Sequence, residues 1–178
     1  DKIHRAANDM VELTEAFLLL AREADSGFAS ERLCLNDVVA AEIIRCEMVY
    51  KQKANDLILH ATGRVWVLAS PTVVGTVVGN LIRNACAYTD HGRVVVTISS
   101  GQIKIEDSGV GISDDQLEAV FSAYYRAPDA RESGHGIGLS IVKRMTDRYD
   151  WPLEISSERG HGTVITVRFP ESDFEITT

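Results

Sequence analysis

The chain has 178 residues, of which 45% are hydrophobic, and it carries a formal net charge of -8. This length suits one domain of ordinary size, and the apolar fraction supports a full core, which excludes an intrinsically disordered chain. The acidic balance, without any basic run, argues against a nucleic-acid-binding protein, so we expect no nucleic-acid partner.

The cysteines and the apolar segments indicate the compartment. Cys34, Cys46 and Cys86 are scattered and lack metal-binding spacing, which fits a reducing cytosol. No apolar run reaches the roughly 18 residues of a membrane span, and no signal peptide is present. We therefore expect that this piece neither crosses a membrane nor is exported. The chain begins without Met inside a predicted helix, so we expect it to be a fragment of a longer protein.

Residues 1–26 are predicted to form a helix that stands apart from the rest of the chain. Apolar residues recur there every seven positions in two rows, which are Ile3, Met10 and Phe17, and Ala6, Leu13 and Leu20. Such rows form an a/d seam and favour a bundle helix that packs against a partner helix. The sequence leaves open the alternative of an amphipathic helix packed on its own domain.

Residues 30–170 are predicted to form an α+β domain. In chain order we first expect a strand over 32–35 and a helix capped by Asn36 or Asp37 and ending near 53, followed by strands over 56–60 and 65–69 that pair as a hairpin. A helix over 71–88, opened by Ser70 and Pro71, should precede a second hairpin of strands 93–99 and 102–106. The domain should end with a helix over 139–149 and paired strands over 153–156 and 164–169. Hairpins interleaved with helices imply a two-layer α/β sandwich, in which a mixed, mostly antiparallel sheet carries helices on one face. The polar tail, 171–178, is expected to fray.

Two glycine-rich stretches, 107–112 and 134–139, carry the strongest functional signal. In the first, a carboxylate ends a strand and is followed by glycines, where no side chain blocks a flat ligand. The second leads into a helix N-terminus, whose free N–H groups and dipole favour a phosphate. A base-binding carboxylate and a phosphate-binding loop predict a nucleotide site, although the spacing matches neither the dinucleotide fingerprint nor the P-loop. The alternative is a pair of glycine loops that serve ordinary turns.

The helix predicted over 71–88 carries a second signal. Asn80, Asn84 and Ala87 lie on one helical face. An amide oxygen can ligate Mg²⁺, whose other ligands are usually waters and substrate phosphates. The alternative is that both asparagines face solvent.

Taken together, these stretches resemble the ATP-binding catalytic domain of bacterial sensor histidine kinases. This family belongs to the Bergerat-fold (GHKL) superfamily, with the gyrase, mismatch-repair and heat-shock chaperone ATPases. The motifs that carry the resemblance follow family order over roughly residues 31–170: an N box at 80–89, glycine boxes at 107–112, 134–139 and 160–163, and a lid aromatic box of Phe121 with 124–126. The resemblance implies that 1–26 is the second helix of the dimerisation hairpin.

The resemblance also implies a role for each matching position. Asp107 would accept a hydrogen bond from the adenine amino group near Thr163, and it would disfavour guanine, which presents an oxygen there. Asn84 would bind Mg²⁺, Asn80 would support the phosphates and catalysis, and Arg126 would approach the γ-phosphate. The full implied set of nucleotide-binding residues is Asn80, Asn84, Asp107, Gly109, Gly111, Ile112, Gly134, Gly136, Ile137, Gly138, Leu139 and Thr163.

Two positions bear on the reaction. The hydrolases of the superfamily place a glutamate where Asn80 stands, and an amide cannot act as a general base, so phosphoryl transfer is favoured over hydrolysis. Ala87 stands where such kinases often carry Lys or Arg, and we hypothesise that Arg83 or Arg131 replaces that cation.

The lid would span residues 113–133 and close over the nucleotide. We expect its flanks to bend at Gly109, Gly111, Gly134 and Gly136.

The phosphoacceptor histidine is expected to lie outside this chain. His4 lacks the acidic residue and the proline that usually follow the acceptor, so we expect that the piece binds ATP but does not phosphorylate itself. The implied partners are ATP with Mg²⁺, the phosphoacceptor domain of the same protein, a response regulator and a second copy in a homodimer. We expect this domain in the cytoplasm, and the sequence leaves open an inner-membrane anchor elsewhere in the parent. The alternatives are a degenerate signalling module without turnover, suggested by Ala87, and an ATPase of the same superfamily.

Overall fold

The computed structural model describes residues 29–122, 125, 136–170 and 172–176. The predicted helix over 1–26 lies outside this part of the chain, as do Arg126, Arg131 and Gly134. Expectations for those residues stay predictions.

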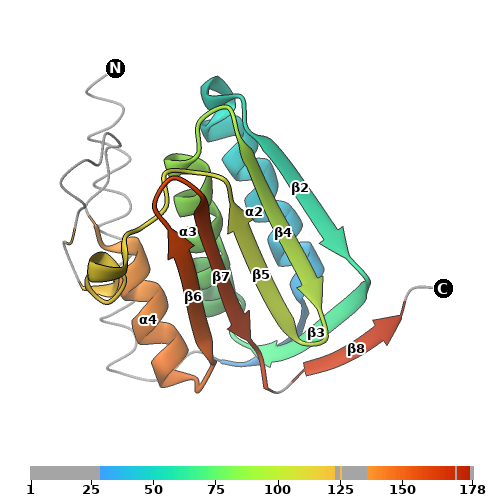
Figure 1. The fold of residues 1–178 in the computed structure, drawn as a ribbon. Helices are drawn as coiled ribbons and strands as arrows, with labels where there is room; N and C mark the ends of the chain where they lie inside the picture. The colour runs from blue at the N-terminus through green and yellow to red at the C-terminus, as the bar shows by residue number, and fades with distance from the viewer. Residues whose placement is uncertain (1–28, 123–124, 126–135, 171, 177–178) are drawn as a thin grey trace, which may run out of the picture.

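The larger of two sheets has five strands in the order β2-β4-β5-β7-β6. These strands are β2 (Asp56–Ala61), β4 (Arg93–Ser99), β5 (Gln102–Asp107), β6 (Leu153–Glu158) and β7 (Gly162–Arg168). β2 runs parallel to β4, and the other neighbouring pairs are antiparallel. One face of the sheet is covered by α2 (Leu35–Val49), α3 (Pro71–Tyr88) and α4 (Gly138–Arg148) (Figure 1). The expected two-layer sandwich is confirmed.

A smaller sheet has the order β1-β3-β8 and is antiparallel throughout. Its strands are β1 (Glu31–Cys34), β3 (Gly63–Ala69) and β8 (Ser172–Ile176). Short 3-10 turns, η1 (Lys51–Lys53), η2 (Asp114–Gln116) and η3 (Ala119–Phe121), complete the described elements.

The hairpin predicted from strands 56–60 and 65–69 is wrong. β2 pairs with β4 in the large sheet, whereas β3 pairs with β1 and β8 in the small one. Only Thr62 separates β2 from β3, which is too short a link for the two-residue reversal of a hairpin. The chain instead turns a corner there and passes from one sheet to the other.

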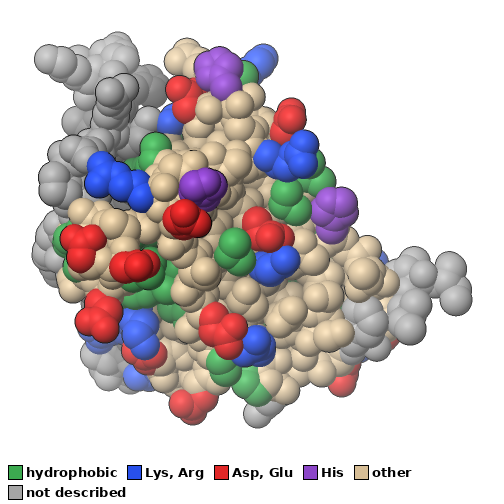
Figure 2. Space-filling view, in the orientation of Figure 1, with side chains coloured by type: hydrophobic (Ala, Val, Ile, Leu, Met, Phe, Trp, Pro, Cys, Tyr) green, Lys and Arg blue, Asp and Glu red, His purple; other side chains and the backbone are tan. Residues whose placement is uncertain are grey.

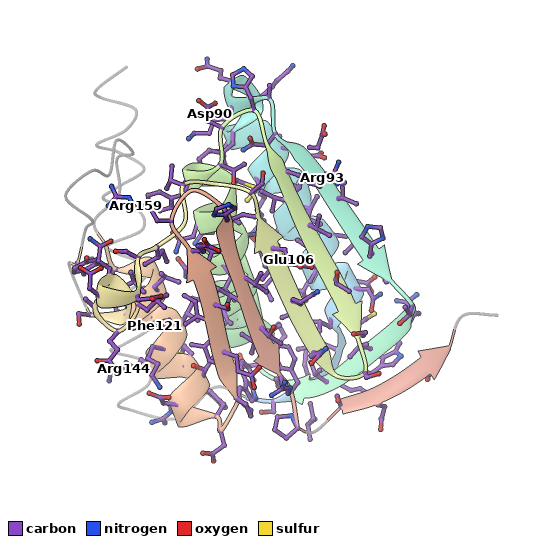
Figure 3. All side chains as sticks on the ribbon, viewed as in Figure 1. Asp90, Arg93, Glu106, Phe121, Arg144 and Arg159 are labelled. Carbon is purple, nitrogen blue, oxygen red and sulfur yellow. The ribbon has the colours of Figure 1, made fainter. Side chains whose placement is uncertain are left out.

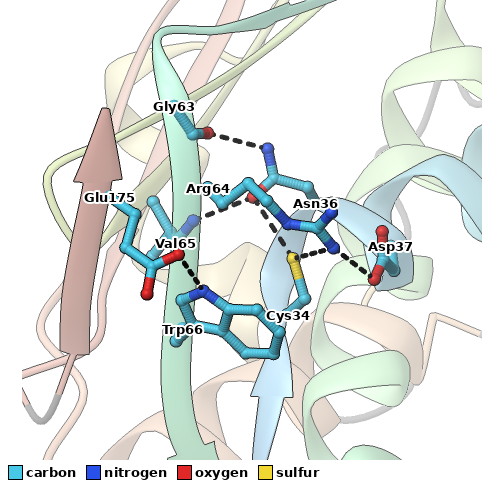
Figure 4. A network of polar contacts seen from close by, with 8 residues as sticks. All are labelled: Cys34, Asn36, Asp37, Gly63, Arg64, Val65, Trp66 and Glu175. Carbon is cyan, nitrogen blue, oxygen red and sulfur yellow. Dashed lines mark hydrogen bonds and ion pairs between the residues drawn. The ribbon is translucent and has the colours of Figure 1, made fainter. Parts of the chain in front are cut away.

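The prediction that the polar tail frays is also wrong for residues 172–176. They form β8, whose backbone pairs with β3 from Gly63 to Val67. The indole N–H of Trp66 donates to the Glu175 carboxylate at 3.2 Å (Figure 4). The Arg32 guanidinium stacks 4.3 Å from the centre of the Trp66 ring and lies 3.5 Å from Glu175. Polar residues therefore stabilise this strand from its exposed face.

The predicted cap of the first described helix is wrong as well. α2 begins at Leu35 and ends at Val49, and neither Asn36 nor Asp37 is its N-cap. The Asn36 amide instead donates to the Gly63 carbonyl at 2.9 Å and accepts from the Val65 N–H at 3.0 Å (Figure 4). These bonds fasten the start of α2 to the start of β3.

α3 is the central helix of the hydrophobic core. Its buried residues are Val73, Val74, Val77, Val78, Gly79, Leu81, Ile82, Ala85 and Cys86. They pack with the alternate, inward residues of β4 and β5, such as Val96 and Ile105. Since each fully buried apolar side chain contributes roughly 1.5–3 kcal/mol, α3 is held firmly, and the face that carries Asn80 and Asn84 is held with it.

All three cysteines are buried free thiols. Among the described helices, none has the length and hydrophobicity that a membrane span requires. On the uncovered face of the large sheet, acidic and basic side chains are interspersed (Figure 2), with Lys104 2.7 Å from Glu106 and Arg168 2.5 Å from Glu154.

Candidate functional site

The candidate site begins with a row of three polar residues at one end of the large sheet. Asp107 of β5 lies opposite Thr163 of β7, and Thr163 lies opposite Ser157 of β6. Directly opposed residues of antiparallel strands project to the same face. Ile105 and Ile165, two positions along their strands, are buried, so this face is the one that the helices cover.

Asp107 is a partly buried carboxyl group held by backbone donors. Its Oδ1 accepts the Gly109 N–H at 2.9 Å. Burial raises the pKa of the carboxyl group above its ordinary value, and the backbone N–H groups of Gly109 and Thr163 oppose that rise. The structure therefore presents a hydrogen-bond acceptor in a partly desolvated place, and its contact with adenine stays a prediction.

Two glycines let the backbone close tightly around Asp107. A Cβ at Gly109 would lie 2.3 Å from the Tyr88 carbonyl oxygen, so only glycine fits between α3 and the strand end. Gly162 has a φ of +99°, and a Cβ there would lie 1.8 Å from the Asp107 carbonyl oxygen. The loops on either side of the row are thus held in place by backbone contact.

Gly111 and Gly136, two of the expected lid flanks, both adopt left-handed backbone conformations. Between them, η3 packs on α4 and ends at Phe121, which with Tyr125 is one of the two described residues of the aromatic box (Figure 3). The structure thus places sharp bends at both positions, and the lid motion itself stays a prediction.

Ser157 is a site residue that sequence reasoning missed. Its Oγ accepts the Ile112 N–H at 2.8 Å, donates to the Gly162 carbonyl at 2.8 Å and lies 2.9 Å from the Thr163 hydroxyl. The available signal was a polar residue at an inward position of a strand, in register with Leu153 and Ile155. The predicted residue Ile112 thus joins the site through its backbone.

The amide of Asn80 is fixed in orientation on α3. Its Nδ2 donates to the Thr76 carbonyl at 2.8 Å, and its Oδ1 accepts from the Arg83 guanidinium at 3.0 Å. A Cβ at Gly138 would lie 2.9 Å from this oxygen, so the first turn of α4 lies directly against the amide. Asn84 follows one turn later and is half-buried.

Arg83 is held on two sides. Besides Asn80, it faces the buried carboxylate of Glu42, whose Oε2 lies 3.9 Å from Nη1. The other Glu42 oxygen lies 2.6 Å from Arg45. The hypothesis that Arg83 supplies a phosphate contact stays a prediction. Its described contacts show that it orients Asn80.

The N-terminus of α4 completes the site. Ile137 is its N-cap, and the Ser140 hydroxyl donates to the Ile137 carbonyl at 2.7 Å. Within the described residues, no side chain caps these N–H groups and the first turn has no acidic residue. With Gly136, Gly138 and Leu139 around it, this end suits an anion.

The donor set also suits a magnesium ion that arrives with phosphates. The described residues contain no group of three His, Cys, Asp or Glu side chains that could hold a metal alone. Asn84 offers an amide oxygen, a ligand type that Mg²⁺ accepts alongside phosphate oxygens and waters.

Comparison with known proteins identifies the family. Residues 69–173 match the family model described as histidine kinase-, DNA gyrase B- and HSP90-like ATPase. The chain belongs to this family. Within it, the chain is 31% identical over 182 residues to the sensor histidine kinase RppB of Synechocystis sp., covering 94% of this chain and 39% of that protein. It is 30% identical over 148 residues to the sensor protein SrrB of Staphylococcus aureus, covering 76% of this chain and 25% of that protein.

These matches confirm the ATP-binding catalytic domain of the sensor histidine kinase type. The chain spans well under half the length of these curated relatives.

Solved structures of family members share the fold. The mycobacterial sensor histidine kinase MprB has a TM-score of 0.69 at 22% identity, covering 83% of this chain and 99% of that one. Full-length ShkA in complex with AMPPNP has a TM-score of 0.77 at 19% identity, and the match covers 97% of this chain and 37% of that one. At these identities the likeness shows the fold alone.

Proposed function

We propose that this chain binds MgATP and transfers its γ-phosphoryl group to a histidine outside the chain. The observation that carries the proposal is an acceptor row, Asp107 and Thr163, at one end of the large sheet, together with an N-terminus of α4 that lies against Asn80 of α3. Asn80 joins the two, since it lies on the helix that packs against both. The parent protein would be a two-component sensor kinase.

Each part of the proposed site has a physical role. Asp107 would accept from the adenine amino group, and the α4 N-terminus with Gly136, Gly138 and Leu139 would hold the phosphates. Asn84 would hold Mg²⁺, which supplies charge neutralisation for phosphoryl transfer. Arg126 and Gly134, outside the described residues, are proposed to complete the γ-phosphate contacts.

The residue at position 80 supports transfer over hydrolysis. An amide cannot take the proton of an attacking water, and both ends of the Asn80 amide are already engaged with Thr76 and Arg83. We propose that the accepting histidine belongs to a phosphoacceptor domain of the same protein, with 1–26 as part of its dimeric hairpin. A response regulator would receive the phosphoryl group. We place this domain in the cytoplasm.

Equilibrium titration with MgATP tests the proposal. Replacing Asp107 by Asn keeps an oxygen for the Gly109 N–H but removes the charge and adds a donor. We expect affinity at least about tenfold weaker, because hydrogen bonds to charged groups are worth roughly 1.5–3 kcal/mol. Glu106→Gln is the matched control, since that neighbour lies on the opposite face beside Lys104 and should bind like the parent.

A second candidate is a degenerate module that signals without turnover. Ala87 supports this candidate, because its side chain provides no cation for a phosphate. Its backbone carbonyl accepts a hydrogen bond from the ammonium group of Lys53. A folded parent that shows no saturable MgATP binding would shift the assignment to this candidate.

A further inference from the structure

The hydroxyl of Ser157 has a complete set of hydrogen-bond partners. A hydroxyl carries one hydrogen and two lone pairs. The Gly162 carbonyl can only accept, so the Ser157 hydrogen points to it, at 2.8 Å. The Ile112 amide can only donate, so it takes one lone pair, also at 2.8 Å. The second lone pair of Ser157 is left for Thr163.

It follows that Thr163 donates its own hydrogen to Ser157 across their 2.9 Å contact. Thr163 is 9% exposed, so water cannot easily replace this bond. Its oxygen then offers only lone pairs to a ligand. Asp107, opposite Thr163 in the neighbouring strand, is a carboxylate and also only accepts when ionised.

We propose that Ser157 is a specificity-determining positioning residue, which directs the Thr163 hydrogen away from the ligand and makes the side chains of Asp107 and Thr163 a wall of hydrogen-bond acceptors. This proposal rests on the proposed function, because it assumes that a purine meets this wall. A 6-amino purine presents donors to the wall, whereas a 6-oxo purine presents an oxygen that faces other acceptors. Ser157 therefore contributes to the choice of ATP without touching it.

The test compares dissociation constants of the full chain for MgATP and MgITP, whose bases differ at position 6, amino against oxo, and at N1, which is an acceptor in adenine and an N–H donor in hypoxanthine. In Ser157→Ala, the Thr163 hydroxyl is free to donate to the 6-oxo group. We expect the preference for MgATP over MgITP to fall about tenfold, the effect of one hydrogen bond regained. Ser157→Thr keeps the hydroxyl and should keep the preference. Ser156→Ala, an exposed neighbour, should also keep it.

A double variant shows whether the effect passes through Thr163. In a Thr163→Val background, Ser157→Ala should leave the nucleotide preference unchanged. If Ser157→Ala does not fold, Ser157→Cys serves instead, because a thiol is a weak acceptor. Equal weakening of both nucleotides, or a changed preference in the Thr163→Val background, would overturn this proposal alone. A folded parent without saturable MgATP binding would overturn the proposed function and this proposal with it.

Discussion

The protonation equilibrium of the Asp107 carboxyl group is subject to two opposing effects. Burial raises the pKa of its carboxyl group, because desolvation penalises the ionised form. A bound adenine amino group would favour the ionised form, because a carboxylate accepts at both oxygens. The N–H groups of Gly109 and Thr163 lower the pKa and keep the ionised form accessible. Binding and stability should therefore respond to pH in opposite directions.

Asp107→Asn should remove both responses. The folded pKa lies above the unfolded value of about 3.9, so the parent loses stability from this group as pH rises through the folded pKa. MgATP affinity should rise over the same interval. We expect both changes to be absent from the variant, when Tm and Kd are measured from pH about 4 to about 7. Identical affinity profiles for parent and variant would contradict a role for the Asp107 carboxylate.

At the scale of elements, the turn between β6 and β7 supports the site by close backbone approach. Gly160 and Gly162 both have positive φ angles, of +84° and +99°. They differ in their surroundings. A Cβ at Gly160 would meet nothing within 4 Å, whereas a Cβ at Gly162 would lie 1.8 Å from the Asp107 carbonyl oxygen. The pair therefore separates backbone strain from steric contact.

Gly160→Ala should lower the free energy of unfolding by about 1–2 kcal/mol, the cost of the strained backbone alone. Gly162→Ala should cost at least about 3 kcal/mol, because the strand end at Asp107 must also move. Urea unfolding of both variants measures the difference. Equal losses would show that β5 yields to the added methyl group without cost.

Comparison of the helices and strands with the expected ones shows which elements can be predicted from the sequence. α3 was predicted correctly because its signals are local: Ser70 before Pro71, then apolar residues at helical spacing. The hairpin of β4 and β5 likewise follows from its turn at Gly101. β2 was misassigned because its partner β4 lies across the intervening helix α3, and a parallel pairing leaves no turn to recognise. β8 was missed because the polar composition of residues 171–178 suggested a solvated tail that is not part of a sheet.

The candidate site likewise contains residues with a local sequence signal and a residue whose contacts are long-range. Asp107, Asn80 and Gly138 can be named as candidates from the sequence because each stands in a recognisable motif, and their roles in binding stay predictions. Ser157 cannot be named in this way, because its bond to Ile112 joins residues 45 positions apart in the sequence. Such a contact depends on the register between neighbouring strands, which cannot be read from local sequence patterns.

At the scale of the whole molecule, the small sheet lies at the opposite end from the candidate site (Figure 1). Trp66 of β3 links the three strands, since Arg32 of β1 stacks on its ring and Glu175 of β8 accepts its N–H, and Arg64 of the same strand also lies over the ring. None of these residues belongs to the nucleotide-binding set. The fold therefore offers a place where stability can be changed without touching the site.

Trp66→Ala should lower the free energy of unfolding by roughly 1–3 kcal/mol, through the lost cation–π contacts and hydrogen bond. Tm should fall by roughly 2–10 °C. MgATP affinity should stay within about twofold of the parent, given the distance from the site. Leu68→Ala, on the same face and 54% exposed, is the control and should change Tm less. A large loss of affinity in a folded Trp66→Ala protein would show that the two ends are coupled.

The pairing of β1 and β8 on either side of β3 has a mechanical meaning. Glu31, where β1 begins, lies beside Ala69, whereas Ile176, where β8 ends, lies beside Gly63 at the other end of β3. A tension applied between these two points acts along the strands, in shear, and loads the ladder bonds together instead of unzipping them one by one. The loaded strand, β3, runs through Ser70 straight into α3. A pull or twist on the flanking segments would therefore reach the asparagine-bearing helix through stiff structure.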